Sequence, residues 1–291
     1  ILRFATYVMS FAVLLQSSPT YGYSFPLTGG KQIVCENWIN LLAVGATPLA
    51  ITNCFIFCNP YNEEIMVEFF ECLEVIIQTC EFLEYPVVSG NVSFYNGTNR
   101  KNINPTPVIG GVGLIKKLSK PINHNFKQEN SHLVLIGKTF GHIEQSCFLK
   151  ENYSIIEGMP PEINLHNEKN NGETLLKLIQ ENLVLSSHDV SSGGLITAIS
   201  EMTFSSEIGA KILKPKKLAN FINYLFGEDQ ARYVVEIASN NLSKAEKILK
   251  NSNIYYEIIG FTQKNNLEVE DEFKINVKDL FKINNQWYNN Y

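Results

Sequence analysis

The segment from Pro86 to Asn96 carries side chains that can bind a phosphate group together with a metal ion. Its apolar start and its Ser-Gly-Asn-Val-Ser core predict a buried strand that ends in a tight polar turn. Gly90 allows close approach of a ligand to the backbone, while Asn91 and Ser93 offer an amide oxygen and a hydroxyl beside backbone N–H groups. The combination suits a magnesium–phosphate group, although a Gly-Asn turn taken alone is more often an ordinary loop.

A second polar side chain, Asn53, stands in the apolar run from Pro48 to Phe57, which predicts a buried strand. A small polar residue near the end of such a strand lies at the crevice of the sheet edge, where ligands bind. Taken alone, Asn53 could equally satisfy local backbone groups. Lys31 precedes a predicted helix and could meet a phosphate, but a solvated surface lysine is the favoured interpretation.

The segment from Ser187 to Leu195 contains His-Asp followed by Ser-Ser-Gly-Gly and allows two interpretations. In the first, His188 is a general base oriented by Asp189. This is disfavoured because adjacent residues rarely face each other productively. In the second, the Ser-Ser-Gly-Gly turn is a phosphate nest at a helix N-terminus and Asp189 holds it, with a structural role favoured over ligand binding. Farther on, Arg232 is predicted to anchor a carboxylate as a structural contact.

The composition is that of a globular protein. The chain has 291 residues, 45% of them hydrophobic and 18% charged, enough for two domains. Its formal net charge of −5 argues against a nucleic-acid partner, which would require clustered Lys and Arg. The six cysteines lack the paired spacing of a zinc or redox site, so reduced thiols and a cytoplasmic location are favoured.

The first fifteen residues resemble the apolar core of a signal peptide. The run is too short to span a bilayer, so no membrane partner is expected. The alternative interpretation is a buried strand through Phe11–Leu15, with Gln16 after it.

The alternation of strand and helix patterns predicts an α+β (α/β) fold. We expect two domains, residues 1–122 and 123–291, with a polar linker between Lys116 and Asn130. In the first domain the patterns predict loops at Ser18–Tyr23 and Thr28–Lys31, helices around Val34–Val44 and at Glu63–Leu83, and strands at Val87–Val88 and Val108–Ile115. In the second they predict strands at Leu133–Gly137, Leu183–Leu185, Tyr233–Ile237 and Tyr255–Phe261, and helices at Glu173–Glu181, Leu195–Met202 and Ser243–Lys250. After Lys264 no pattern is evident, and the tail from Asn284 is expected to fray.

Several motifs follow one another in a distinctive order and spacing. They are Asn37–Cys54, Phe57–Pro60, Pro86–Asn96, Asn104–Gly113, Ser187–Leu195 and Leu225–Arg232. Together they closely resemble the carboxy-terminal half of phosphoribosylformylglycinamidine synthase, from about Ser18 to about Ile275. The resemblance implies a module shared with aminoimidazole ribonucleotide synthetase: a sheet-pairing amino-terminal domain, then an α/β domain.

The resemblance also implies a function. The family is an ATP-dependent ligase that converts formylglycinamide ribonucleotide into the formylglycinamidine, with ammonia from a glutaminase domain or subunit. By residue matching, Asn53 and Gly90 would contact ATP, Asn91 would bind Mg²⁺, and Ser93 would contact the ribonucleotide substrate. A neutral Asn adds no charge, so carboxylates and phosphate oxygens elsewhere would complete the metal site.

The family's catalytic His-Asn-His-Pro-type segment belongs to the amino-terminal half, and Asn123-His124-Asn125 lacks its context. No catalytic residue is therefore assigned to this chain, and an amino-terminal half is expected as a partner. Two alternatives remain open. One is an enzyme like aminoimidazole ribonucleotide synthetase, and the other is a non-catalytic structural or nucleotide-binding half.

Overall fold

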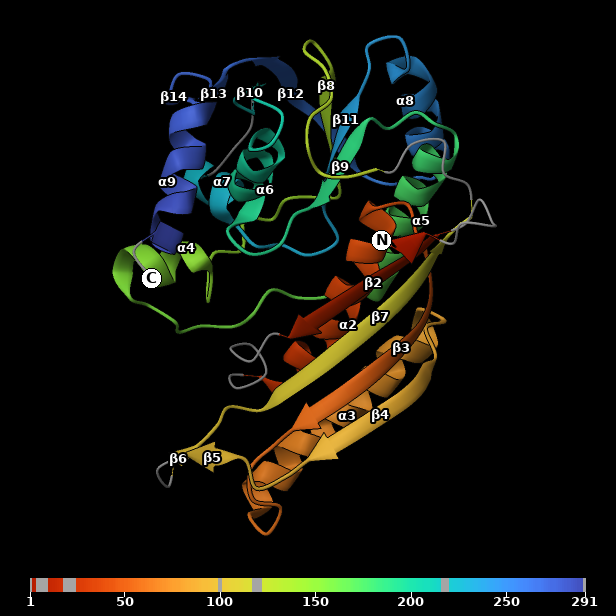
Figure 1. The fold of residues 1–291 in the computed structure, drawn as a ribbon, viewed down its shortest axis with the longest axis vertical. Helices are drawn as coiled ribbons and strands as arrows, with labels where there is room; N and C mark the ends of the chain where they lie inside the picture. Colours follow the sequence, from red (N-terminus) through yellow and green to blue (C-terminus); the bar gives the residue numbers. More distant parts are fainter. Residues whose placement is uncertain are drawn as a thin grey trace.

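The computed structural model describes residues 2–3, 10–17, 25–98, 101–116, 122–215 and 220–289. Within these residues, two units of mixed helices and strands each consist of a sheet with helices packed against it (Figure 1). The predicted α+β class is confirmed. Among the described helices, none is long and apolar enough to cross a membrane.

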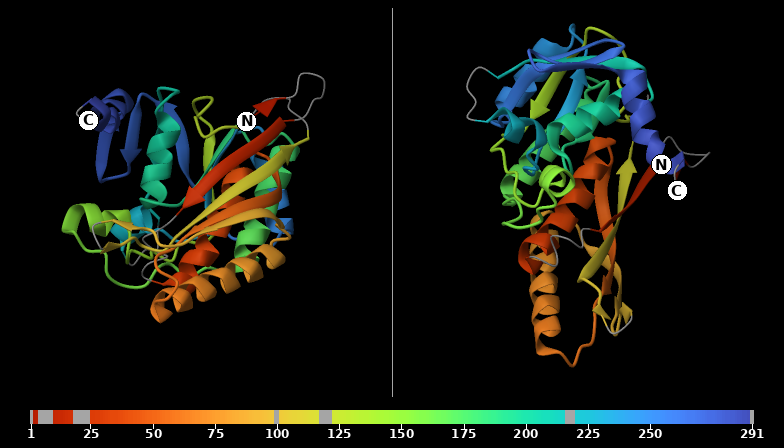
Figure 2. Two further views of the ribbon diagram at one scale, coloured as in Figure 1. Left: turned by 60° about the horizontal axis from the view of Figure 1, so that its bottom comes forward. Right: turned by 90° about the vertical axis from the view of Figure 1, so that its left-hand side faces the viewer.

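The first unit is built on a five-stranded sheet of order β1-β2-β7-β3-β4. Its strands are β1 (Leu2–Arg3), β2 (Ser10–Ser17), β3 (Thr47–Ile56), β4 (Val87–Ser93) and β7 (Thr106–Ile115), and a small pair, β5 (Gly97–Thr98) and β6 (Lys101–Asn102), extends from it. Helices α2 (Pro26–Ala43) and α3 (Glu63–Phe82) lie on the same face of the sheet (Figure 2).

Helices α2 and α3 begin with different N-terminal residues. Pro26 opens α2, where a missing N–H is tolerated, and the helix then buries most of its side chains. In α3 the Asn62 side chain caps the backbone N–H of Glu64, and two glutamates in the first turn favour the positive end of the helix dipole.

The second unit is built on a seven-stranded sheet of order β14-β13-β10-β12-β8-β11-β9. Its strands are β8 (His132–Ile136), β9 (Ser186–Asp189), β10 (Ile208–Ile212), β11 (Tyr233–Ile237), β12 (Tyr256–Lys264), β13 (Asn266–Val269) and β14 (Phe273–Asn276). Its helices are α4 (Cys147–Tyr153), α5 (Leu165–Gln180), α6 (Gly194–Thr203), α7 (Phe221–Phe226), α8 (Leu242–Asn251) and α9 (Val277–Asn289). Alternate residues of β8 join different buried clusters: Val134 packs with α5 and α8, and Leu135 packs with α6 and α7. A strand covered on both faces has to be apolar throughout, which explains the run at 133–136.

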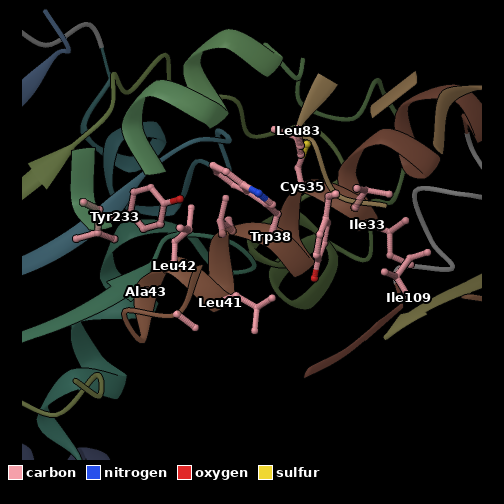
Figure 3. Close-up of a cluster of buried hydrophobic side chains, with 14 of the residues drawn as sticks. Ile33, Cys35, Trp38, Leu41, Leu42, Ala43, Leu83, Ile109 and Tyr233 are labelled. Carbon is pink, nitrogen blue, oxygen red and sulfur yellow. The ribbon is translucent and has the colours of Figure 1, made fainter. Parts of the chain in front are cut away.

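Helix α2 joins the two units. Its Trp38 and Leu42 belong to the same buried cluster as Leu175 of α5 and Tyr233 of β11 (Figure 3). On the other side of α2, Ile109 of β7 completes the cluster. The two sheets therefore share one core around α2.

Most predicted elements are confirmed, but several boundaries are wrong. Thr28–Lys31 lies inside α2 rather than in a loop. The strand predicted at Leu183–Leu185 instead forms at Ser186–Asp189. The chain after Lys264 forms β13, β14 and α9, and that helix continues to Asn289. The predicted loop at Ser18–Tyr23 lies outside the described residues.

Strand β4 departs most from expectation. Gly90–Ser93 continues the strand rather than turning, and the strand is exposed along nearly its whole length, with Val88 71% exposed. The reason is its place at the edge of the sheet, where no strand of the described residues pairs with its outer side. An apolar edge pair such as Val87–Val88 cannot be told from a buried one by sequence alone.

The sheet face opposite the helices is apolar and uncovered within the described residues. On β2, the side chains of Val13 and Leu15 are 57% and 72% exposed, while the alternating Ala12 is buried. We predict that the isolated chain self-associates through this face, because an exposed apolar sheet face favours contact with another such surface.

Light scattering at increasing protein concentration measures this association. A Val13→Lys/Leu15→Lys double variant should be more monomeric than the wild type, whereas Val67→Lys, an equally exposed apolar position on α3, should change little. A wild-type chain that stays monodisperse and monomeric at moderate concentration would contradict the prediction.

Candidate functional site

The four residues assigned by resemblance lie on the adjacent strands β3 and β4. These strands run parallel, with Asn53 opposite Gly90. A Cβ atom at position 90 would lie only 2.6 Å from Asn53 Oδ1. Glycine is therefore what allows the Asn53 side chain to lie against β4 in this position. Asn53 and Gly90 are thus direct neighbours across the strand pair.

Asn91 and Ser93 project to the other face of the strand pair. Side chains alternate along a strand, and Asn91 lies opposite Cys54 while Ser93 lies opposite Ile56. The exposed Asn91 donates its Nδ2–H to Cys54 Sγ at 3.4 Å. The four residues thus share one edge of the sheet, but their side chains divide between its two faces.

Asn96 holds the end of β4 in place, a role that the sequence did not suggest. Its Nδ2 donates to the carbonyl oxygens of Phe57 and Ser93, each at 2.9 Å, and lies 3.1 Å from Ser93 Oγ. The amide therefore ties the chain after β3 to the chain after β4. Ser93 Oγ is oriented by this contact rather than free to rotate.

The donor set fits one part of a magnesium site. Asn91 uses its Nδ2 on Cys54, so its Oδ1 is left as a hard oxygen ligand of the type that Mg²⁺ prefers. Among the described residues, no group of three or more His, Cys, Asp or Glu side chains is placed to hold a metal ion. Asn91 can therefore supply one ligand, and the others would have to come from phosphate oxygens, water or another chain segment.

His188 lies between two carboxylates. Its Nδ1 is 3.1 Å from Asp189 Oδ1, and its Nε2 is 2.9 Å from Glu201 Oε2. The expectation that the adjacent His and Asp would not face each other is wrong, because the strand ends at Asp189 and the chain turns there. Burial opposes a charge on the ring, but the two carboxylates outweigh it and raise the pKa of His188 to about 9. A histidine protonated at neutral pH is an ion-pair partner and not a general base.

The Ser-Ser-Gly-Gly turn has a structural role. Gly193 and Gly194 adopt φ of +80° and +72°, which a residue with a side chain rarely adopts. Gly193 N donates to Glu228 Oε1 at 2.7 Å, and Cys147 N donates to the same oxygen at 2.7 Å. The nest therefore already holds a carboxylate of this chain, but that carboxylate is Glu228, whereas the sequence had suggested Asp189 as the residue that holds the turn.

Arg232 is also structural. Its guanidinium donates to the backbone oxygens of Asp229 and Gly227, and its Nη2 lies 4.0 Å from Asp229 Oδ2. The predicted carboxylate partner is thus present, but the backbone contacts are closer. Arg232 holds the loop that carries Glu228 and Asp229.

Sequence reasoning missed a pair of buried carboxylates between the two units. Glu36 on α2 and Glu168 on α5 are both buried. Glu36 accepts hydrogen bonds from Gln16 and Gln32. The available signal was a glutamate inside the apolar run Ile33–Leu42.

Two family models match the chain. The AIR synthase related protein N-terminal domain matches residues 6–115, and the corresponding C-terminal domain matches residues 128–272. The chain belongs to the AIR synthase related family. The resemblance to phosphoribosylformylglycinamidine synthase seen in the sequence motifs is confirmed by the relatives that follow.

Among the curated relatives, the phosphoribosylformylglycinamidine synthase subunit PurL of Pelagibacter ubique is 48% identical over 280 residues. The match covers 96% of this chain and 38% of that protein, so the chain spans well under half the length of its relative. The PurL subunit of Bradyrhizobium sp. is 39% identical with the same coverage. A solved structure of Thermotoga maritima PurL complexed with FGAR superposes with a TM-score of 0.78 at 17% identity, covering 96% of this chain and 47% of that one. At this low identity the structure shows the shared fold.

Proposed function

We propose that the chain supplies the carboxy-terminal half of an ATP-dependent phosphoribosylformylglycinamidine synthase in purine biosynthesis. The whole enzyme would join glutamine-derived ammonia to formylglycinamide ribonucleotide, with the ammonia made by a glutaminase domain or subunit. The observation that carries the proposal is the pairing of Asn53 with Gly90 beside Asn91 and Ser93 on an exposed sheet edge. We also propose that the two family domains divide at residues 122 and 123 and that the protein acts in the cytoplasm.

The reaction requires a better leaving group than an amide oxygen. In the proposed reaction the amide oxygen of the substrate attacks the γ-phosphorus of ATP, ADP leaves, and ammonia then displaces phosphate from the activated carbon. When bound, Mg²⁺ would neutralise charge on the phosphates.

The residues of this chain would bind and orient the reactants. Gly90 presents backbone next to the Asn53 amide, so that together they can hold the nucleotide. Asn91 would offer Oδ1 to the ion, while Ser93, oriented by Asn96, would contact the ribonucleotide. The uncovered outer sheet face, on which Asn91 and Ser93 lie, is where the amino-terminal half would pack and bring the catalytic histidine.

Two substitutions in an enzyme that contains both halves test these roles. We expect Asn91→Ala to weaken the magnesium-dependent use of ATP, seen as a higher KM for MgATP and a rate loss of about ten-fold or more. Ser93→Ala should chiefly raise KM for the ribonucleotide, by about five- to ten-fold for one lost hydrogen bond. Steady-state kinetics with each substrate varied in turn separate the two effects.

Ser89→Ala is the matched control, because Ser89 lies on the same strand and alternates onto the same face as Asn91 and Ser93. It should leave both KM values unchanged. Wild-type rates and KM values in both the Asn91 and the Ser93 variant would show that the residues were assigned incorrectly.

A further inference from the structure

A cavity lies in the second unit, at the start of helix α5. It has a volume of about 340 Å³, within the range of small-molecule sites. It is formed where the loop after β8, the first turn of α5 and the start of β11 meet. Its walls include Phe140, His142, Asn164, Asn167, Asp229 and Gln230. None of the residues that line it belongs to β3 or β4, so the cavity is separate from the proposed ATP edge.

One wall of the cavity is rigid. The buried carboxylate of Asp229 accepts backbone hydrogen bonds from Phe140 at 3.0 Å, Gly141 at 2.8 Å and His142 at 3.1 Å. The His142 ring is fixed as well, since its Nε2 lies 2.8 Å from the carbonyl oxygen of Met159. Three hydrogen bonds to one carboxylate hold this loop in a single conformation.

This rigid loop presents an exposed aromatic ring. The Phe140 side chain is 72% exposed, and the ammonium of Lys138 lies 4.9 Å from its ring centroid. A large apolar ring exposed at the mouth of a polar cavity can stack on a flat ligand, as aromatic side chains stack on bases.

The backbone at Ala231, which also lines the cavity, is strained. Ala231 has φ of +60°, a conformation that L-residues adopt rarely. Its carbonyl oxygen is held by Asn171 Nδ2 at 2.8 Å. Strain of this kind persists where the surroundings fix it and is concentrated at ligand sites.

Half of the described polar side chains that line the cavity are carboxamides, namely Asn164, Asn167 and Gln230. Asn164 uses its Oδ1 to cap Asn167 N, and Gln230 donates its Nε2–H to Glu228 O at 3.2 Å, so Asn164 Nδ2 and Gln230 Oε1 remain as a donor and an acceptor. Asn and Gln carboxamides match the adjacent donor and acceptor on the edge of adenine.

The charges of the cavity disfavour a phosphate. Two of its lining residues, Glu162 and Asp229, are carboxylates, and the described residues that line it include no Lys or Arg. The nearby cations are Lys138, which lies against the Phe140 ring, and Arg232, whose Nη2 lies 4.0 Å from Asp229 Oδ2. A flat heterocycle with hydrogen-bonding groups on its edge and no attached anion fits these walls better than a nucleotide does.

We propose that this cavity binds an unphosphorylated purine base or nucleoside whose edge carries the hydrogen-bonding groups of adenine. The base would stack on Phe140 and pair with the carboxamides of Asn164, Asn167 and Gln230. This site goes beyond the proposed ligase function and does not depend on it.

Isothermal titration calorimetry with adenosine tests the proposal on the 291-residue chain. We expect saturable binding that is tighter for adenosine than for AMP or ATP, because added phosphates meet the two carboxylates. Phe140→Ala should weaken adenosine binding by about ten-fold or more, the size of one lost base–aromatic stack. Asn167→Ala should also weaken it.

Two control variants test whether a loss of adenosine binding is specific to this cavity. Tyr153→Ala removes another exposed aromatic residue outside the cavity, and Asn53→Ala alters the proposed ATP edge. Both should leave adenosine binding unchanged, and circular dichroism should show that every variant folds. Absence of saturable adenosine binding, or equal binding by the Phe140→Ala variant, would overturn the proposal. If Asn53→Ala abolished adenosine binding and Phe140→Ala did not, adenosine would bind at the β3–β4 edge proposed for ATP and not in this cavity.

Discussion

The Glu168→Gln variant should be more stable than the wild-type chain above pH 8 and no more stable than the wild type near pH 5. Glu168 is completely buried, and within the described residues neither of its carboxylate oxygens has a hydrogen-bond partner. The nearby backbone N–H of Ala231 lowers the pKa of this carboxyl, but burial outweighs it. A buried carboxylate without partners is strongly disfavoured in its charged form.

Burial, followed by the charge of Glu36, raises the pKa of Glu168 from 4.5 to about 8. Burial likewise raises the pKa of Glu36 to about 7, and the negative charges of Asp189 and Glu228 add to this rise. Hydrogen bonds from Gln16 and Gln32 lower the pKa but do not cancel the effect of burial. The other titratable groups near Glu168 are the buried Cys35 and Tyr233, whose own pKa values are raised by burial and by Glu168. None of these groups offers a positive charge to a Glu168 carboxylate.

The sign of the pH dependence follows from the raised pKa. The folded chain holds its proton more tightly than the unfolded chain, so the stability associated with Glu168 is present below pH 4.5 and is lost as pH rises through about 8. At roughly 1.4 kcal/mol for each pKa unit, the shift corresponds to about 5 kcal/mol as an upper bound. Glutamine removes this loss, but its unpaired amide costs about 1–3 kcal/mol, so the net gain appears only at high pH.

Urea unfolding at pH 5, 7 and 9, followed by circular dichroism, measures the difference. Glu173→Gln on the exposed side of the same helix is the control and should show a much smaller pH-dependent change. If the stability difference between Glu168→Gln and wild type were the same at pH 5 and pH 9, Glu168 would not be a neutral acid in the folded chain.

The 291-residue chain alone should form no measurable formylglycinamidine from the ribonucleotide, ATP and ammonia. By the family resemblance, the catalytic histidine and most magnesium carboxylates belong to the other half. Removing catalytic residues and metal ligands from an active site typically reduces the catalytic rate by orders of magnitude. The residual contacts at Asn53 and Gly90 would give roughly millimolar or weaker ATP binding, since an open strand edge encloses little of the ligand.

A coupled assay for ADP formation, with ammonium chloride in place of glutamine, measures this activity. Turnover by the chain alone, dependent on the ribonucleotide, would contradict the half-enzyme account. His188 would then be the first group to test, although its two carboxylate partners hold it protonated in the structure.

The sequence was most informative where local pattern and burial agree. The apolar runs at β3, β7, β8 and β11 predicted strands because both the residue types and the lengths are those of strands. Helix α3 was predicted because its apolar residues repeat at the helical period. Beyond Lys264 the pattern failed, since β13, β14 and α9 are short or mostly exposed and carry few buried residues.

The sequence motifs proposed residues for the candidate site but did not predict their geometry. The motifs identified Asn53, Gly90, Asn91 and Ser93, yet only the strand register shows that Asn53 and Asn91 face opposite sides of the sheet. The burial of Glu168 depends on how α5 packs against α2, and the sequence contains no local sign of it. Contacts between distant segments are set by tertiary packing, which neither spacing nor composition encodes.

The most direct test is reconstitution of the two halves in trans. The amino-terminal part of the Pelagibacter ubique relative, which this chain does not span, would be mixed with the chain, the ribonucleotide, MgATP and ammonium chloride. The account predicts formylglycinamidine and equimolar ADP only when both parts are present, with a rate at least about ten-fold lower when the chain carries Asn91→Ala. A stable complex of the two parts that makes no product, or that makes it equally well with Asn91→Ala, would contradict the claim that this chain completes the ATP site.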